Sequence, residues 1–216
     1  MSEAPSGPIA EQTVSGFLQA VASDAPTPGG GAVAGVSGAT GAALIAMVAG
    51  LTVGKAGYEA VDDRMRELIR ESEAARAEFL ALADADAHAF DGVMAAFKMP
   101  KETDEQKAAR SAAIQDGYVD AAQVPLGTAR RAVEVMALAE DATAMGNPQA
   151  ASDGLSGATS LYCAALCAIA NVEINAAALK DEARRTAMLD EVASLKGRAD
   201  QRLKDTQTVF QLRLTS

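Results

Sequence analysis

Apolar residues recur at helical spacing along most of the chain. The first stripe, through Val14, Phe17, Leu18 and Val21, follows the pattern of an amphipathic helix. Residues typical of strands are sparse and never alternate with polar residues for long, whereas Ala, Leu, Glu, Arg and Met recur throughout. The pattern predicts a single all-α domain over residues 1–216. It is expected to be a helical bundle with one long helix at 59–97 and further helices at 11–22, 32–53, from 103 to Pro125, 126–144, 154–172 and 181–212.

Turn residues mark the expected ends of these helices. The segment SDAPTPGGG at 23–31 contains two prolines and three consecutive glycines, which predict a loop. Thr103 followed by Gln106 predicts a capping box after the turn KMPKET. Pro125 is expected to break or kink the helix that follows. At MGNP, we expect Gly146 to adopt the left-handed cap conformation and Pro148 to prevent continuation of the helix.

Two stretches, 25–54 and 154–172, contain no charged residue. The first is long enough to cross a membrane, but it is richer in Ala, Gly, Ser and Thr than in Leu, Ile or Phe, which favours a buried helix in a soluble bundle. Each stretch contains a similar block, GVSGATG at 35–41 and GLSGATS at 154–160. This similarity is either a coincidence in a chain rich in Ala and Gly or a shared device for close helix packing.

Charge and cysteine content narrow the functional classes. The formal net charge is −10, which argues against nucleic acid as a partner because such binding depends on Lys and Arg. Cys163 and Cys167 share one helix face and are interpreted as buried apolar residues, since no second pair of metal ligands accompanies them. The N-terminal sequence MSEAPSGPIAEQ lacks the features of a signal peptide. We therefore expect a cytoplasmic protein with no metal site and no membrane partner.

Two segments carry possible chemistry. Gly29, Gly31 and Ala34 fit the pattern G-x-G-x-x-A, but no buried strand precedes them, so a dinucleotide fold is not supported. What remains is a set of backbone N–H groups at the N-terminus of the following helix. No side chains obstruct them, so they could hold an anion or a carbonyl. Asp84, Asp86 and His88 lie in the long helix, where they are either solvated charges or a source of acid–base chemistry.

Five segments of the chain resemble one enzyme family. They are APTPGGGAVAGVSGATGAALIAMVAGLTVGKAGY at 25–58, DADAHAFDGVMAAFKMPKET at 84–103, VPL at 124–126, GNPQAASD at 146–153 and NVEIN at 171–175. Together they are similar to the cyclodeaminase domain of formimidoyltransferase-cyclodeaminase and to stand-alone methenyltetrahydrofolate cyclohydrolases. The resemblance implies an all-helical homodimer that acts on a reduced folate as substrate, with no tightly bound cofactor, metal or nucleotide.

The family has two related reactions. A cyclohydrolase adds water to the one-carbon bridge of methenyltetrahydrofolate to give 10-formyltetrahydrofolate, whereas a cyclodeaminase closes a formimino group into that bridge and releases ammonia. No transferase domain is fused to this chain, so we expect the cyclohydrolase reaction, with the cyclodeaminase reaction as the alternative. A non-catalytic dimeric scaffold is a rival from another class.

The resemblance also suggests site residues. Asp86 corresponds to the acid of a D-x-x-A-F motif and is the first catalytic candidate, with Asp84 and Lys55 next. Lys55 could instead satisfy carbonyls at a helix C-terminus. Asn147, Ser152 and Asp153 could either cap a helix or recognise the pterin edge, and Asp153 could do both. The full set of expected substrate-binding residues is Pro28, Gly29, Gly30, Gly31, Tyr58, Asn147, Ser152 and Asp153.

Overall fold

The computed structural model describes residues 7–215, which contain only helices, turns and loops. Residues 1–6, which belong to the N-terminal segment interpreted above as not being a signal peptide, lie outside the described part. The α-helices are α1 (Val14–Val21), α2 (Gly30–Gly50), α3 (Asp62–Phe97), α4 (Asp104–Met145), α5 (Ala151–Ala177) and α6 (Glu182–Arg213). Short 3-10 turns lie at Ile9–Glu11, Glu59–Val61 and Pro148–Ala150. The predicted all-α helical bundle is confirmed.

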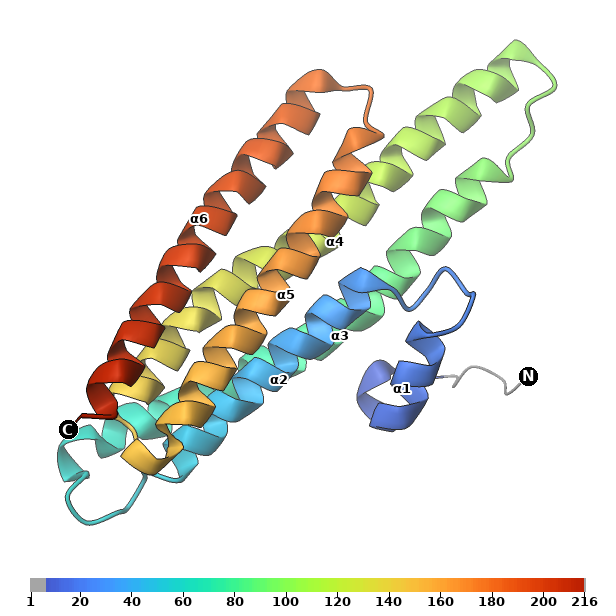
Figure 1. Cartoon of the computed structure of the whole chain (residues 1–216). Helices are drawn as coiled ribbons and strands as arrows, with labels where there is room; N and C mark the ends of the chain where they lie inside the picture. The colour runs from blue at the N-terminus through green and yellow to red at the C-terminus, as the bar shows by residue number, and fades with distance from the viewer. Residues whose placement is uncertain (1–6, 216) are drawn as a thin grey trace.

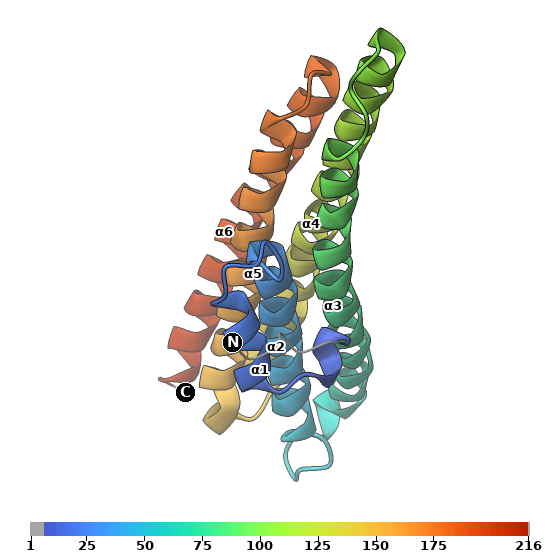
Figure 2. The ribbon, with the colours of Figure 1, turned by 90° about the vertical axis from the view of Figure 1, so that its right-hand side faces the viewer.

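Helices α2 to α6 alternate in direction and form an elongated bundle, with α1 at its side (Figure 1). The α3–α4 hairpin extends well past the N-terminus of α2. Seen from the side, this hairpin and the α5–α6 hairpin diverge beyond that N-terminus (Figure 2). Phe17 of α1 is buried with Ala32 of α2 and Ala83 of α3, which holds α1 against the bundle. The N-terminus of α2 therefore lies between two diverging hairpins.

Helices α2 and α5 pack closely because glycine lets their backbones approach neighbouring helices. A Cβ on Gly35 would lie 2.7 Å from the Phe79 carbonyl oxygen of α3, and a Cβ on Gly41 would lie 2.8 Å from the Gly157 carbonyl oxygen of α5. The two similar glycine blocks therefore meet where α2 packs on α5. Equivalent glycines have different neighbours, however, since Gly154 packs on Thr143 of α4. The prediction of two central Gly/Ala-rich helices is confirmed, although each is buried on one side only. The interpretation of Cys163 and Cys167 as buried residues is wrong, because Cys163 is exposed and Cys167 is only partly buried on α5.

Replacing Gly35 by leucine is expected to lower the free energy of unfolding by about 1–3 kcal/mol or more, because the added side chain would meet the backbone of α3. Gly197→Ala in α6 is the matched control, since a Cβ there meets nothing within 4 Å. The control should be neutral or slightly stabilising, because alanine favours helix over glycine. Urea unfolding measures both variants, and equal midpoints would contradict the close approach at Gly35.

Several helix boundaries differ from the sequence prediction. Helix α4 continues through Pro125, so of the predicted break or kink the break is wrong, and α3, α4 and α6 are all long rather than α3 alone. Gly146 has φ −73° and ψ 177°, so the predicted left-handed cap is also wrong. Its backbone N–H still donates to the Ala142 carbonyl, and a Cβ there would crowd that oxygen at 2.4 Å. The capping box of Thr103 and Gln106 is present as predicted.

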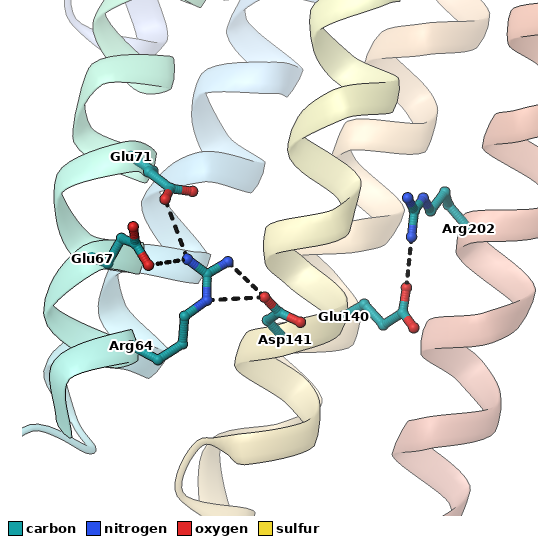
Figure 3. Close-up of polar contacts among 6 residues, drawn as sticks. All are labelled: Arg64, Glu67, Glu71, Glu140, Asp141 and Arg202. Carbon is teal, nitrogen blue, oxygen red and sulfur yellow. Dashed lines mark hydrogen bonds and ion pairs between the residues drawn. The ribbon is translucent and has the colours of Figure 1, made fainter. Parts of the chain in front are cut away.

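Ion pairs join the long helices on the outside of the bundle (Figure 3). Arg64 of α3 donates to Asp141 of α4 at 2.6 Å and to Glu67 and Glu71 of its own helix. Arg202 of α6 donates to Glu140 of α4 at 3.1 Å. All six residues are partly exposed, so each pair contributes only about 0–1 kcal/mol to folding. The pairs are interpreted as fixing the alignment of the three helices.

By length and composition, α2 and the segment Pro148–Ala177 could each cross a membrane. Of the most apolar window in each, 56% and 44% respectively is buried inside the bundle. Core helices of soluble proteins pass the same test. Helices α3, α4 and α6 cover one side of these two helices, and the other side is exposed.

Candidate functional site

A cleft of about 600 Å³ lies at the N-terminal end of α2. It is bounded by the loop before α2, by α3 and α4, and by the C-terminal part of α5, where the two hairpins diverge (Figure 2). Among residues 7–215, Asp86 is the only charged residue that lines it. The lining residues are Pro26, Thr27, Gly29, Gly30, Asp86, Ala89, Phe90, Tyr118, Ala121, Asn171, Ile174, Asn175, Ala177 and Ala178.

The carboxyl group of Asp86 faces the first turn of α2. Burial raises the pKa of Asp86 above its ordinary value, and a hydrogen bond from the Ala32 backbone N–H partly offsets that increase. Since the first N–H groups of a helix lack partners within the helix, an acceptor from α3 is well placed there. A half-buried carboxyl with a raised pKa at the edge of a cleft is typical of an acid–base group.

Glycine at the start of α2 makes room for this carboxyl group. Gly29 is the N-cap of α2 and provides no side-chain cap of its own. A Cβ on Gly31 would lie only 2.0 Å from Asp86 Oδ1, so Gly31 must lack a side chain for Asp86 to reach Ala32. Pro28, which follows a cis peptide bond with Thr27, lies between Thr27 and Gly29 but does not itself line the cleft. Of the predicted 28–31 segment, the structure therefore places Gly29 and Gly30 in the cleft with Asp86 and Gly31 directly against the Asp86 carboxyl group.

The opposite wall carries two amides that the sequence analysis did not assign to the site. Asn171 and Asn175 are one helical turn apart on α5 and both line the cleft. Asn171 Nδ2 donates to the Cys167 carbonyl at 2.8 Å, and a Cβ on Gly30 would lie 3.0 Å from the same nitrogen. The NVEIN motif contains both residues, and two amides at i and i+4, which share one face of the helix, were the signal available.

Apolar and aromatic groups complete the cleft. Phe90 of α3 and Tyr118 of α4 form part of its wall, and Ile174 of α5 is 70% exposed at its side. Tyr118 packs edge-on against Phe97, with ring centroids 6.4 Å apart, which limits its movement. Flat walls beside a few polar groups suit a planar ring system with hydrogen-bonding edges. Sequence reasoning missed Phe90 and Tyr118 because single aromatic residues in amphipathic helices are usually core residues.

Asp84 and His88 lie outside the cleft lining. Asp84 Oδ1 accepts a hydrogen bond from the Ile9 backbone N–H at 2.8 Å, so this carboxylate holds the N-terminal 3-10 turn against α3. The His88 side chain is 83% exposed and lies 3.9 Å from Asp91. The structure therefore gives Asp84 a local structural role, and it does not bring Asp84 or His88 together with Asp86.

The remaining predicted residues lie at the other end of α2. Asn147 follows α4, and its backbone N–H donates to Thr52 Oγ1 at 2.9 Å, just beyond the C-terminus of α2. Its side chain accepts from the Gln149 N–H and so caps the 3-10 turn before α5. Ser152 and Asp153 are in the first turn of α5, and Lys55 and Tyr58 follow α2. Helix α2 is about 30 Å long, so this group is far from Asp86 within one chain.

The exposed Lys55 side chain borders a separate hollow of about 400 Å³. The backbone N–H of Lys55 donates to the Thr52 carbonyl at 3.2 Å. The hollow is bounded by Gly54, Lys55, Glu59, Asp62, Asp63 and Arg66, so it is much more strongly charged than the cleft. The single chain thus divides the predicted site into two groups, one around Asp86 and one around Lys55.

Comparison with known proteins identifies the family. The family model for formiminotransferase-cyclodeaminase matches residues 13–194. The chain belongs to this family of enzymes. It is 42% identical to a methenyltetrahydrofolate cyclohydrolase of Methylorubrum extorquens over 85% of this chain and 88% of that relative. It is 36% identical to a formimidoyltransferase-cyclodeaminase of Sus scrofa over 83% of this chain but only 33% of that longer relative.

A solved structure from the family has the same fold. Formiminotetrahydrofolate cyclodeaminase of Thermotoga maritima superposes with a TM-score of 0.84 and 30% sequence identity. The match covers 94% of this chain and 98% of the other. The expectation of this family, stated from the five sequence segments, is confirmed, and the match extends over nearly the whole bundle.

Proposed function

We propose that the chain hydrolyses 5,10-methenyltetrahydrofolate to 10-formyltetrahydrofolate. The observation that carries the proposal is the half-buried Asp86 carboxyl, held at the N-terminus of α2 inside a cleft to which the described part of the chain contributes no other charged residue. The 42% identity to a protein named methenyltetrahydrofolate cyclohydrolase supports the same reaction. The substrate carries a positive charge on its one-carbon bridge, which an acidic cleft would attract.

The proposed mechanism assigns one proton transfer to Asp86. Ionised Asp86 accepts a proton from water while the water oxygen bonds to the bridge carbon, which becomes tetrahedral and neutral. The bond between this carbon and N5 of the pterin then breaks, and N5 takes up the proton held by Asp86. As the carbon–oxygen double bond forms, the hydroxyl group on the carbon loses its proton, which is released to solvent and leaves Asp86 ionised. The one-carbon unit remains on N10 as a formyl group. The proposal uses no metal and no tightly bound cofactor.

The decisive experiment follows the loss of methenyltetrahydrofolate absorbance in the presence of the purified protein. A parallel assay measures ammonia release from formimidoyltetrahydrofolate, because several relatives are named formimidoyltransferase-cyclodeaminase. Hydrolysis well above the spontaneous rate supports the proposal. Ammonia release without hydrolysis would replace it by the cyclodeaminase reaction, and activity in neither assay would favour the scaffold interpretation. Fractionation tests the accompanying proposal of a cytoplasmic location without a membrane partner.

We further propose that the protein is a homodimer formed through the outer faces of α2 and α5. These helices pack side by side, and the exposed positions on each recur every three or four residues, as in a helix seam. From Thr40 on α2 and as far as Ala170 on α5 these positions are uncharged: they are Thr40, Ala43, Met47 and Gly50 on α2, and Ser152, Ser156, Thr159, Cys163 and Ala170 on α5. Glu173, near the C-terminal end of α5, is exposed and charged and lies beyond this face. An uncharged face of this size on an acidic protein supports a second copy as the occupant.

The same dimer accounts for the divided site. If α2 packs antiparallel to its symmetry mate, Lys55 of one protomer approaches the Asp86 cleft of the other. Lys55 would then meet the carboxylate tail of the folate, whereas the cleft itself offers no cation. In this arrangement neither protomer has a complete site alone.

Mixing two impaired variants tests this arrangement. Asp86→Asn and Lys55→Ala homodimers, exchanged at equal amounts, should regain about a quarter of parental activity, because half of the dimers are mixed and each has one intact site. Light scattering establishes the dimer first. Activity no higher than the mean of the two variants, despite proven exchange, would place both residues in the same chain's site or remove Lys55 from the site. Met47→Glu should weaken the dimer, whereas Asp190→Lys on exposed α6 is the matched control.

A further inference from the structure

Helix α4 contains a carbonyl that its own helix cannot satisfy. In a regular α-helix the N–H of residue 125 would donate to the carbonyl of residue 121, but Pro125 has no N–H. Pro125 and Ala121 are both buried, so water does not readily replace the missing donor. The donor comes from α5, because Asn175 Nδ2 lies 3.0 Å from the Ala121 oxygen. This bond explains how α4 continues through a proline.

The bond also fixes the orientation of Asn175. Its second amide hydrogen is directed to the Asn171 carbonyl, at 2.9 Å. Rotating the amide by half a turn would place Oδ1 against two carbonyl oxygens, so the orientation is determined by the backbone around it. Both donors are therefore used within the protein. What Asn175 retains for the cleft that it lines is Oδ1, to which no residue in 7–215 donates.

The cleft therefore offers two side-chain acceptors to a ligand. Asp86 provides a carboxylate and Asn175 a carbonyl oxygen, while no Lys, Arg or His is among the lining residues. A reduced pterin ring has N–H groups along one edge and, in the methenyl form, a positive charge on the bridge. Acceptors on the protein and donors on the ligand are complementary, and an unpaired acceptor in a cleft is costly when the ligand lacks the donor.

We propose that Asn175 Oδ1 binds an N–H group of the reduced pterin ring and that Pro125 is a positioning residue for it. Pro125 acts by freeing the Ala121 carbonyl, which then holds the Asn175 amide in one orientation. The proposal rests on the proposed folate function and adds to it the group that recognises the ring. It also gives the VPL segment a chemical role that its sequence alone does not reveal.

The test measures binding of the stable reduced folate 5-formyltetrahydrofolate by calorimetry. Asn175→Leu keeps the side-chain size and removes the acceptor, and it should weaken binding about 10-fold. Pro125→Ala restores the N–H to α4 and should weaken binding about 3- to 10-fold without lowering the melting temperature. In the double variant, Pro125→Ala should cause no further loss, because its effect passes through Asn175. In turnover assays both single variants should raise KM far more than they lower kcat.

Gln115→Leu is the matched control. Gln115 also links α4 to the end of α5, donating to the Ala178 carbonyl at 3.2 Å and accepting from the Lys180 N–H at 2.7 Å, but it does not line the cleft. Its folate affinity should stay parental even if stability falls. Parental affinity in folded Asn175→Leu overturns the proposal, and independent losses in the double variant overturn the role of Pro125. Parental protein that binds 5-formyltetrahydrofolate but hydrolyses nothing refutes only the proposed reaction, whereas parental protein that binds no reduced folate refutes both.

Discussion

Asp86→Asn is expected to leave the protein folded and to lower kcat for methenyltetrahydrofolate hydrolysis by about 10²–10⁴-fold. Asparagine has nearly the same shape as aspartate, and its carbonyl can still accept the Ala32 backbone N–H that the carboxylate accepts now. It cannot take a proton from water, and it removes the one charge in the cleft wall. Binding of a reduced folate without the charged bridge, such as 5-formyltetrahydrofolate, should therefore change less than turnover.

The pH profile provides a second measure of the same variant. Burial raises the pKa of Asp86 above its ordinary value, and a general base works only in its ionised form. Parental kcat/KM should therefore rise with pH through this raised pKa and be lost below it. Asp86→Asn should lack this acidic limb. A parental profile in the variant would assign the titration to another group.

Asp91→Asn is the matched control for this experiment. Asp91 is on the same helix, its side chain is 74% exposed, and it does not line the cleft, so its turnover should be parental. Asp84→Asn separates the two acidic candidates. Because Asp84 accepts a hydrogen bond from the Ile9 backbone N–H, this variant should lose local stability and keep its turnover. Parental turnover in well-folded Asp86→Asn would leave Asp86 as a helix cap only.

Gly31→Ala is expected to reduce turnover by about 10²-fold while the protein stays folded. The added Cβ would lie 2.0–2.3 Å from the atoms of the Asp86 carboxyl group, which must then leave its place beside Ala32. The carboxyl is the free end of a short side chain, so it can rotate away without moving α3. Alanine also favours the helix over glycine, which limits the loss of stability. Kinetics and thermal unfolding measured together test this separation.

Gly92→Ala controls for adding a methyl group to a helical glycine. A Cβ on Gly92 meets nothing within 4 Å, and Gly92 follows Asp86 in α3. Both turnover and melting temperature should therefore be at least parental. The double variant of Gly31→Ala with Asp86→Asn should be no slower than Asp86→Asn alone, because both changes act on one group. Fully additive losses would show that Gly31 acts on the reaction independently of Asp86.

Local sequence patterns predicted most of the fold. Helical periodicity, the capping box at Thr103 and the proline–glycine loop before α2 indicated where helices lie, because each depends on residues within a few positions of one another. The uncharged stretches predicted which two helices would be central. The errors came where a neighbouring helix overrides a local signal. Pro125 was expected to break or kink its helix, but the helix is not broken, and a side chain from α5 provides the hydrogen bond that proline cannot.

The sequence alone determined the helices, the family and the segments that carry polar groups, since these follow from neighbouring residues and from shared motifs. Only the tertiary structure decided which of those groups meet. It placed Asp86 against Gly31 and Asn175 against Ala121, and it put Lys55 at the opposite end of α2 from Asp86. The physical reason is that helix periodicity specifies which face of each helix is buried. The partner of that face, and the position along it where two residues meet, depend on how long antiparallel helices align when they pack.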